Sequence, residues 1–151
     1  YESIFNKIST RFYSSSYKRL KVKNIAIIGM GIMGRNHYRT LKKISGVNIV
    51  AHCDVEKNDD YEEPFYNDVD LMLDEAMPDA LIIAAPTFLH KDIALRCTKR
   101  NIDIFIEKPA ASSVEDAKKI QEAVEASKIK SCVGYIERFN PVVKALIDEI
   151  E

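Results

Sequence analysis

A lysine and a glutamate stand together after an apolar run, in the triplet Glu107-Lys108-Pro109. The run Ile102–Ile106 predicts a buried strand, and ligands of open α/β sheets bind at the carboxyl ends of the strands. An ammonium placed there can hydrogen-bond a substrate hydroxyl and help to manage its proton as a hydride leaves. A solvated surface lysine fits the same spacing, so a catalytic Lys108 needs support from the rest of the chain.

A second group of candidate residues lies in the run Gly29-Met30-Gly31-Ile32-Met33-Gly34, which follows a short apolar segment. Gly29 allows a tight turn, Gly31 removes the side chain that would bar a pyrophosphate from the backbone, and Gly34 permits close helix packing. The following helix offers free N–H groups and a positive dipole end to phosphate. The spacing predicts a bound dinucleotide, although glycines spaced in this way also occur in ordinary tight turns.

Asp54 supports the dinucleotide, because it lies 20 positions after Gly34 at the end of the next apolar run. An acidic side chain at that place can accept hydrogen bonds from an adenosine ribose. It favours NAD over NADP, since a carboxylate repels a 2′-phosphate unless a cation such as Lys57 compensates. The alternative is an exposed aspartate in a turn.

These residues need a parallel sheet to bring them together, and the pattern from Asn24 onward alternates short apolar runs with amphipathic ones. It predicts an α/β fold, a Rossmann-type doubly wound parallel sheet over residues 23–136. The predicted strands are 24–28, 47–53, 65–66, 80–85, 102–106 and 130–136, and the predicted helices are 31–44, 69–77, 89–99 and one capped by Ser112 or Ser113. Residues 54–64 are acidic and predict a loop in place of a second crossover helix.

The two ends of the chain read differently from this core. Residues 1–22 form a basic leader that we expect to be disordered, with a mitochondrial transit peptide as a minor alternative. Residues 137–151 read as a hinge and the first helix of a truncated substrate domain. The apolar stripe of that helix has no partner left in the sequence, unless the helix docks back on the sheet.

Bulk properties exclude several classes of function. The formal net charge of −1 divides into +5 for residues 1–23 and −6 for the rest, so the body has no basic face for nucleic acid. No apolar run reaches the roughly 20 residues of a membrane helix. Cys53, Cys97 and Cys132 have neither zinc-ligand nor disulfide-framework spacing and predict buried thiols, so no metal site is expected.

Taken together, the motifs resemble the glucose-fructose oxidoreductase and inositol dehydrogenase family (Gfo/Idh/MocA), and the resemblance covers nearly all of residues 23–141. The stretches that carry it are G-M-G-I-M-G with Asn36-His37, Ala84-Ala85-Pro86-Thr87 with His90, Glu107-Lys108-Pro109, and G-Y-I-E-R-F-N-P over residues 134–141. The last stretch is most similar to sugar-nucleotide 3-dehydrogenases.

The resemblance implies a two-domain, NAD-dependent cytoplasmic oxidoreductase that moves hydride between nicotinamide and a CH–OH carbon of a sugar, sugar nucleotide or cyclitol. Lys108 would be the active-site lysine, followed by a cis proline, and Tyr135, Arg138 and Asn140 would lie at the hinge near substrate. The cofactor would be bound by Gly29, Gly31, Ile32, Met33, Gly34, Asp54, Ala85, Pro86, Thr87, His90, Glu107 and Lys108. His37 and His90 also fit a purely structural role, capping or packing on helices.

Two departures from the family pattern accompany these expectations. The loop 55–64 is shorter than the usual segment, which puts the wall of the adenine pocket in doubt. The substrate domain, through which the family forms its usual homo-oligomer, is absent, so the fragment alone is expected to be inactive. The alternative from another class is a non-catalytic, dinucleotide-binding redox sensor.

Overall fold

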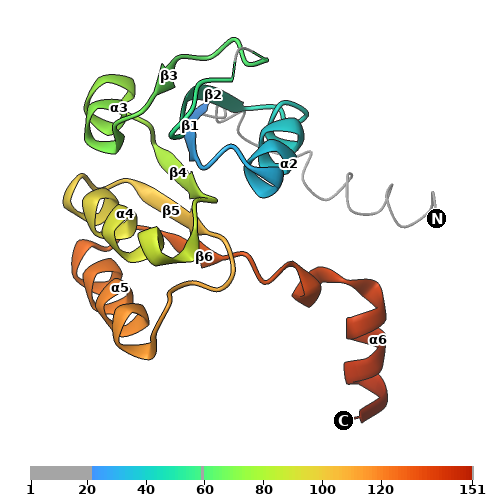
Figure 1. Ribbon diagram of the computed structural model, residues 1–151. Coiled ribbons are helices and arrows are strands. Elements are labelled where there is room, and N and C mark those ends of the chain that lie inside the picture. The colour runs from blue at the N-terminus through green and yellow to red at the C-terminus, as the bar shows by residue number, and fades with distance from the viewer. Residues whose placement is uncertain (1–21, 59, 151) are drawn as a thin grey trace, which may run out of the picture.

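The computed structural model describes residues 22–58 and 60–150, which form one six-stranded sheet in the order β3-β2-β1-β4-β5-β6 (Figure 1). Every strand pair is parallel. The strands are β1 (Lys23–Ile28), β2 (Val47–Cys53), β3 (Phe65–Tyr66), β4 (Ala80–Ile83), β5 (Asp103–Ile106) and β6 (Ser131–Val133). The helices are α2 (Ile32–Leu41), α3 (Val69–Ala76), α4 (Thr87–Lys99), α5 (Val114–Ser127), α6 (Pro141–Ile150) and the 3-10 helix η1 (Ile136–Phe139).

This topology confirms the predicted Rossmann-type fold. The strand order turns back at β1 and β4, since β2 and β3 extend the sheet on one side and β5 and β6 on the other. The connections that leave β1 and β4 therefore diverge, and a crevice opens at the carboxyl edge between them. The glycine turn and the segment after β4 lie at this switch point.

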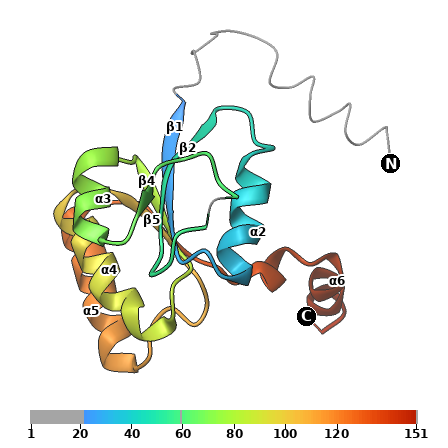
Figure 2. The same ribbon diagram turned by 45° about the horizontal axis from the view of Figure 1, so that its top comes forward.

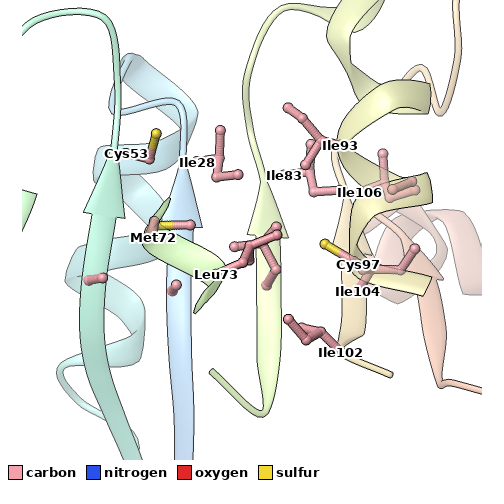
Figure 3. Close-up of a cluster of buried hydrophobic side chains, with 14 of the residues drawn as sticks. Ile28, Cys53, Met72, Leu73, Ile83, Ile93, Cys97, Ile102, Ile104 and Ile106 are labelled. Carbon is pink, nitrogen blue, oxygen red and sulfur yellow. The ribbon is translucent and has the colours of Figure 1, made fainter. Parts of the chain in front are cut away.

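Helices cover both faces of the sheet: α3, α4 and α5 lie on one side and α2 on the other (Figure 2). Successive strand side chains point to opposite faces. Ile28 therefore joins the core with Met72 and Cys97 (Figure 3), while Ile27 packs toward α2. The helix α6 stands apart from both layers beside η1 (Figure 1).

The predicted loop after β2 is confirmed, since the described residues between Asp54 and Pro64 form no helix. Side-chain contacts, rather than a crossover helix, hold this loop against α2. The Tyr38 hydroxyl donates to Glu63 Oε2 at 2.8 Å, and Lys42 Nζ donates to Glu63 Oε1 at 2.9 Å. The Tyr61 ring meets the Tyr38 ring edge to face, with 4.7 Å between centroids.

Local capping explains where two helices begin. The Asp68 side chain accepts a hydrogen bond from the Leu71 N–H at 2.8 Å, and the Ser113 hydroxyl accepts one from the Asp116 N–H at 3.1 Å. Each satisfies a backbone donor that the first helical turn leaves free. The structure thus selects Ser113 as the cap of α5, which the sequence left open between two serines.

Several expectations differ from the structure. The strand β4 ends at Ile83 rather than at residue 85, and α4 begins at Thr87 rather than at residue 89. The helix α2 ends at Leu41, three residues early, and Ile44 is half exposed because the chain turns toward β2 beyond the reach of the core. The strand β6 ends at Val133 because it is an edge strand, paired only with β5. Cys132 is predicted to be buried but is exposed. It lies on the edge strand β6, on the face of the sheet that α2 covers, and α2 contacts β1, β2 and β4 but does not extend as far as β6.

The basic leader predicted over residues 1–22 falls, apart from Val22, outside the described residues. None of the helices in the described part of the chain is long and apolar enough to cross a lipid bilayer.

Candidate functional site

The turn between β1 and α2 requires glycine at two places. Gly29 has a φ of +87°, and a Cβ there would lie 2.5 Å from the backbone of Ala84 and Ala85. A Cβ on Gly34 would overlap the Gly29 carbonyl oxygen. The turn is also held from outside, because the Gly29 N–H donates to the Cys53 carbonyl at 2.9 Å and the Ala84 N–H to the Ile28 carbonyl at 2.8 Å. The backbone therefore passes very close to β4 and brings α2 down onto the strand.

Gly31 differs from these glycines, because a Cβ there would meet no heavy atom of the described chain within 4 Å. Gly31 precedes the first residue of α2, and neither a capping side chain nor an acidic residue occupies the first turn of that helix. The N–H groups and the positive dipole end of α2 therefore face an open space. This arrangement fits a pyrophosphate, so the residues present suit the dinucleotide that the spacing predicts.

Asp54 follows β2 and ties the glycine turn to the neighbouring strand. Its Oδ2 accepts a hydrogen bond from the Met30 N–H at 2.6 Å, and its Oδ1 accepts one from the Val55 N–H at 2.6 Å. Each carboxylate oxygen keeps a further lone pair. Asp54 lines a cavity of about 190 Å³ together with Gly29, Ala85 and Pro86. The cavity also reaches Cys53, where burial raises the pKa of the thiol to about 11.

A larger cavity of about 970 Å³ opens on the other side of the glycine turn. It brings Lys108 together with Met33 of α2, Tyr135 and Arg138, and the apolar side chains of α6 form part of its wall. Its full lining is Met33, Lys108, Gly134, Tyr135, Ile136, Glu137, Arg138, Val143 and Ile147. Lys108 is exposed, so its ammonium is free to meet a ligand in this space.

Asn140 does not line this cavity. Its Oδ1 accepts the Val142 N–H at 3.0 Å, and its Nδ2 donates to Glu137 Oε2 at 2.8 Å. These bonds start α6, so the structure gives Asn140 a capping position, and a contact with substrate stays a prediction.

Glu107 precedes Lys108 and is buried, with 5% of its surface exposed. Its Oε1 accepts a hydrogen bond from His37 Nε2 at 2.7 Å, and its Oε2 accepts the Lys108 N–H at 3.1 Å. His37 is absent from the set of cofactor residues predicted above, although it lies three positions after Gly34, one helical turn along α2. The three-residue spacing from Gly34 is the signal that could have predicted His37 on the side of α2 that faces β5.

His90 lies in the first turn of α4 and is 1% exposed. Its Nε2 lies 2.8 Å from the Ala85 carbonyl oxygen, and its Nδ1 lies 3.1 Å from the Pro109 carbonyl oxygen. Both ring nitrogens are thus occupied by loop backbone, and a direct cofactor contact stays a prediction. Thr87 begins α4 nearby, and the Lys108–Pro109 peptide bond is cis, as predicted.

The two cavities flank the glycine turn, since Gly29 lines the smaller one and Met33 the larger one. An elongated ligand with a negatively charged middle fits this layout. One end would lie beside Asp54, the middle at the amino end of α2, and the other end beside Lys108.

Known proteins resemble this chain closely. The family model for the Gfo/Idh/MocA oxidoreductase family, NAD-binding Rossmann fold, matches residues 23–135. The inositol 2-dehydrogenase of Arthrobacter sp. strain FB24 is 36% identical over 131 residues, which are 81% of this chain and 39% of that protein. The glucose-6-phosphate 3-dehydrogenase of Bacillus subtilis strain 168 is 28% identical over 131 residues, which are 83% of this chain and 37% of that protein.

Among solved structures, scyllo-inositol dehydrogenase from Lactobacillus casei, with bound NAD(H) and scyllo-inositol, superposes with a TM-score of 0.77 at 25% identity. The match covers 85% of this chain and 42% of that one. The chain thus spans about two fifths of the length of the relatives it matches, and it aligns with their dinucleotide-binding part. It therefore belongs to the Gfo/Idh/MocA oxidoreductase family, whose NAD-binding Rossmann domain it contains.

Proposed function

We propose that the protein is an NAD-dependent dehydrogenase that transfers hydride between nicotinamide and a CH–OH carbon of a sugar, sugar nucleotide or cyclitol. The observation that carries the proposal is the single glycine turn with a cavity on each side, one containing Asp54 and the other Lys108. The relatives named above support the substrate class, since they act on inositol and on glucose 6-phosphate.

The backbone N–H groups of Gly31, Ile32, Met33 and Gly34 are the proposed donors to the pyrophosphate, because no described side chain caps them. Asp54 would accept hydrogen bonds from the adenosine ribose through its free lone pairs while its other lone pairs hold Met30 and Val55. A 2′-phosphate would meet this carboxylate, so NAD is favoured over NADP. The rest of the proposed cofactor-binding set is Gly29, Ala85, Pro86, Thr87, His90, Glu107 and Lys108.

Lys108 is the proposed catalytic residue. The nicotinamide ring, when bound, accepts or returns a hydride. When the alcohol is oxidised, Lys108 Nζ would act as the neutral amine, accept the proton that leaves the reacting hydroxyl oxygen and become the ammonium; in the reverse direction the ammonium would return this proton to the oxygen. The apolar side chains of Met33, Val143 and Ile147 line the same cavity and would help to exclude water from the reacting carbon.

Residues 137–151 are proposed to be a hinge and the start of a substrate domain. The apolar side of α6 supports this assignment, because Leu146, Ile147 and Ile150 are exposed rather than packed on the sheet. Tyr135 and Arg138 would then lie where the two domains meet, next to cofactor and substrate.

Cofactor binding is tested by titrating the purified chain with NADH and following fluorescence. Saturable binding is expected, and no binding at millimolar NADH would refute the proposal. The catalytic role is tested in the full-length gene product, where Lys108→Ala should lower turnover far more than it lowers NADH affinity. A non-catalytic redox sensor needs no proton-handling lysine beside the cofactor, so unchanged turnover in this variant would favour that alternative.

A further inference from the structure

Two histidines, the partly buried His37 and the buried His90, hold the residues on either side of Lys108. We propose that His37 and His90 are positioning residues that together fix the backbone at Lys108 and so present its ammonium to the larger cavity. The inference rests on the proposed function only in taking Lys108 as the catalytic residue. It assigns each histidine a role that differs from cofactor binding and from simple packing.

His37 acts from the α2 side of the sheet through Glu107. The carboxylate only accepts hydrogen bonds when ionised, so the His37 Nε2–H donates to Oε1 at 2.7 Å. The other oxygen, Oε2, accepts the Lys108 N–H at 3.1 Å, and this bond holds the backbone at the amino side of Lys108. The His37 ring is itself steadied by an edge-to-face contact with Phe105, 5.2 Å between centroids.

Gly134 makes room for this arrangement. A Cβ there would lie 3.2 Å from Glu107 Oε2 and 3.1 Å from the Phe105 ring, closer than most side chains tolerate. The Gly134 N–H donates to the Ile106 carbonyl at 2.8 Å, so the backbone after β6 closes over the carboxylate. With 5% of its surface exposed, Glu107 has few alternative positions once His37 is bonded to it.

His90 acts from the opposite face of the sheet, on which α4 lies (Figure 2). Its ring bridges the Ala85 and Pro109 carbonyl oxygens, which belong to the loops after β4 and β5. Carbonyl oxygens only accept hydrogen bonds, so a proton on Nδ1 is donated to Pro109 and a proton on Nε2 is donated to Ala85. The bond from Nδ1 to Pro109 restrains the backbone at the carboxyl side of Lys108.

Lys108 therefore lies between two restrained neighbours while its own side chain is free of ion pairs within residues 22–58 and 60–150. The histidines come from separate helices on opposite faces and reach the same three-residue segment. Removing the His37 bond leaves the buried Glu107 carboxylate without one donor, and removing the His90 bond leaves the carbonyl of the exposed Pro109 without its donor. In each case the loop can relax to satisfy the acceptor elsewhere. The expected consequence is a change at the Lys108 amine, several bonds away from either mutation.

The reactivity of the Lys108 amine is measured by competitive trace acetylation of the chain without cofactor. The labelled peptide that contains Lys108 is quantified by mass spectrometry. Lys119 is the internal control, because it lies on α5 and pairs with Glu115 at 2.7 Å, away from the loop. In His37→Leu and in His90→Leu, the labelling rate of Lys108 relative to Lys119 should rise at least threefold. An unchanged ratio in folded variants would overturn the proposal.

Amide variants separate positioning from mere packing, and they decide the matter if the leucine variants do not fold. The side-chain amide nitrogen of glutamine lies about as far from Cα as histidine Nε2, and that of asparagine lies about as far as histidine Nδ1, so each can replace the corresponding donor. His37→Gln should therefore restore the wild-type ratio. His90→Asn, which keeps the donor toward Pro109, should stay near wild type, whereas His90→Gln, which keeps the donor toward Ala85, should behave like His90→Leu. Equal ratios for His90→Asn and His90→Gln would refute the assignment.

The outcome is independent of cofactor binding, because every measurement uses the chain without NADH. Failure of the NADH titration would refute the proposed function and leave this labelling test standing. A wild-type chain that binds NADH, with Lys108 unaffected by all five substitutions, would refute only the role of the histidines.

Discussion

Replacing Gly34 by alanine should force α2 away from the glycine turn. The new Cβ would overlap the Gly29 carbonyl oxygen and lie 2.9 Å from the Gly29 carbonyl carbon, and both atoms belong to backbone held by the sheet. No flexible side chain can yield there, so the helix must shift as a whole. Gly31→Ala is the matched control, because its Cβ meets no described atom within 4 Å.

The magnitude follows from opposing terms. Overpacking of a well-packed site costs about 1–3 kcal/mol, and a collision with backbone belongs at the upper end of that range. Alanine returns up to about 1 kcal/mol of helix propensity. We expect Gly34→Ala to lower the free energy of unfolding by about 2 kcal/mol or more, which corresponds to a fall in Tm of roughly 4–8 °C for a domain of this size. Gly31→Ala should stay within about 1 kcal/mol of wild type.

Urea denaturation followed by circular dichroism measures the stability of both variants, and an NADH titration measures their cofactor affinity. Gly31→Ala should weaken NADH binding at least tenfold, about 1.4 kcal/mol, because its methyl group enters the space proposed for the pyrophosphate. The pair should thus separate, with Gly34→Ala losing stability and Gly31→Ala losing affinity. A Gly34→Ala chain as stable as wild type, or a Gly31→Ala chain that is destabilised without losing affinity, would refute this reasoning.

Three further outcomes are expected. Asp54→Ala should weaken NADH binding more than NADPH binding, measured by fluorescence, and equal losses would contradict the ribose contact. The ring nitrogens of His52 find no hydrogen-bond partner in the described chain, and burial lowers the pKa of this side chain below its unfolded value of about 6.5. The unfolded chain therefore takes up a proton more readily than the folded chain, and the free energy of unfolding falls as the pH falls below about 6.5. His52→Phe should accordingly raise the free energy of unfolding by about 1–3 kcal/mol at pH 7.5 and by more at pH 5, and an equal gain at both would contradict the titration. A thiol reagent should modify exposed Cys132 in the native chain and spare buried Cys53 and Cys97, whose pKa values are raised by burial to about 11 and about 12.

Much of the fold was predictable because its signals are local. The strand and helix pattern, the serine cap of α5 and the glycine turn depend on residues within a few positions of one another, and those interactions form wherever the segment folds. The same holds for the carboxyl-edge positions of Asp54 and Lys108, which follow once the strands are parallel. The family resemblance, carried by motifs in order along the chain, likewise needed no coordinates.

Only the tertiary structure decided which distant groups meet. His37 and Glu107 are 70 residues apart in sequence, and the Met30 N–H donates to Asp54 from the end of β1 to the end of the neighbouring β2. The packing of the chain, and not the local sequence pattern, brings these pairs together. The exposure of Cys132 depended on how far α2 extends across its face of the sheet, which no alternation of apolar residues reports. The sequence by itself therefore determined the fold, the cofactor class and the candidate lysine, whereas the packing of α2 and α4 decided how the backbone around that lysine is held.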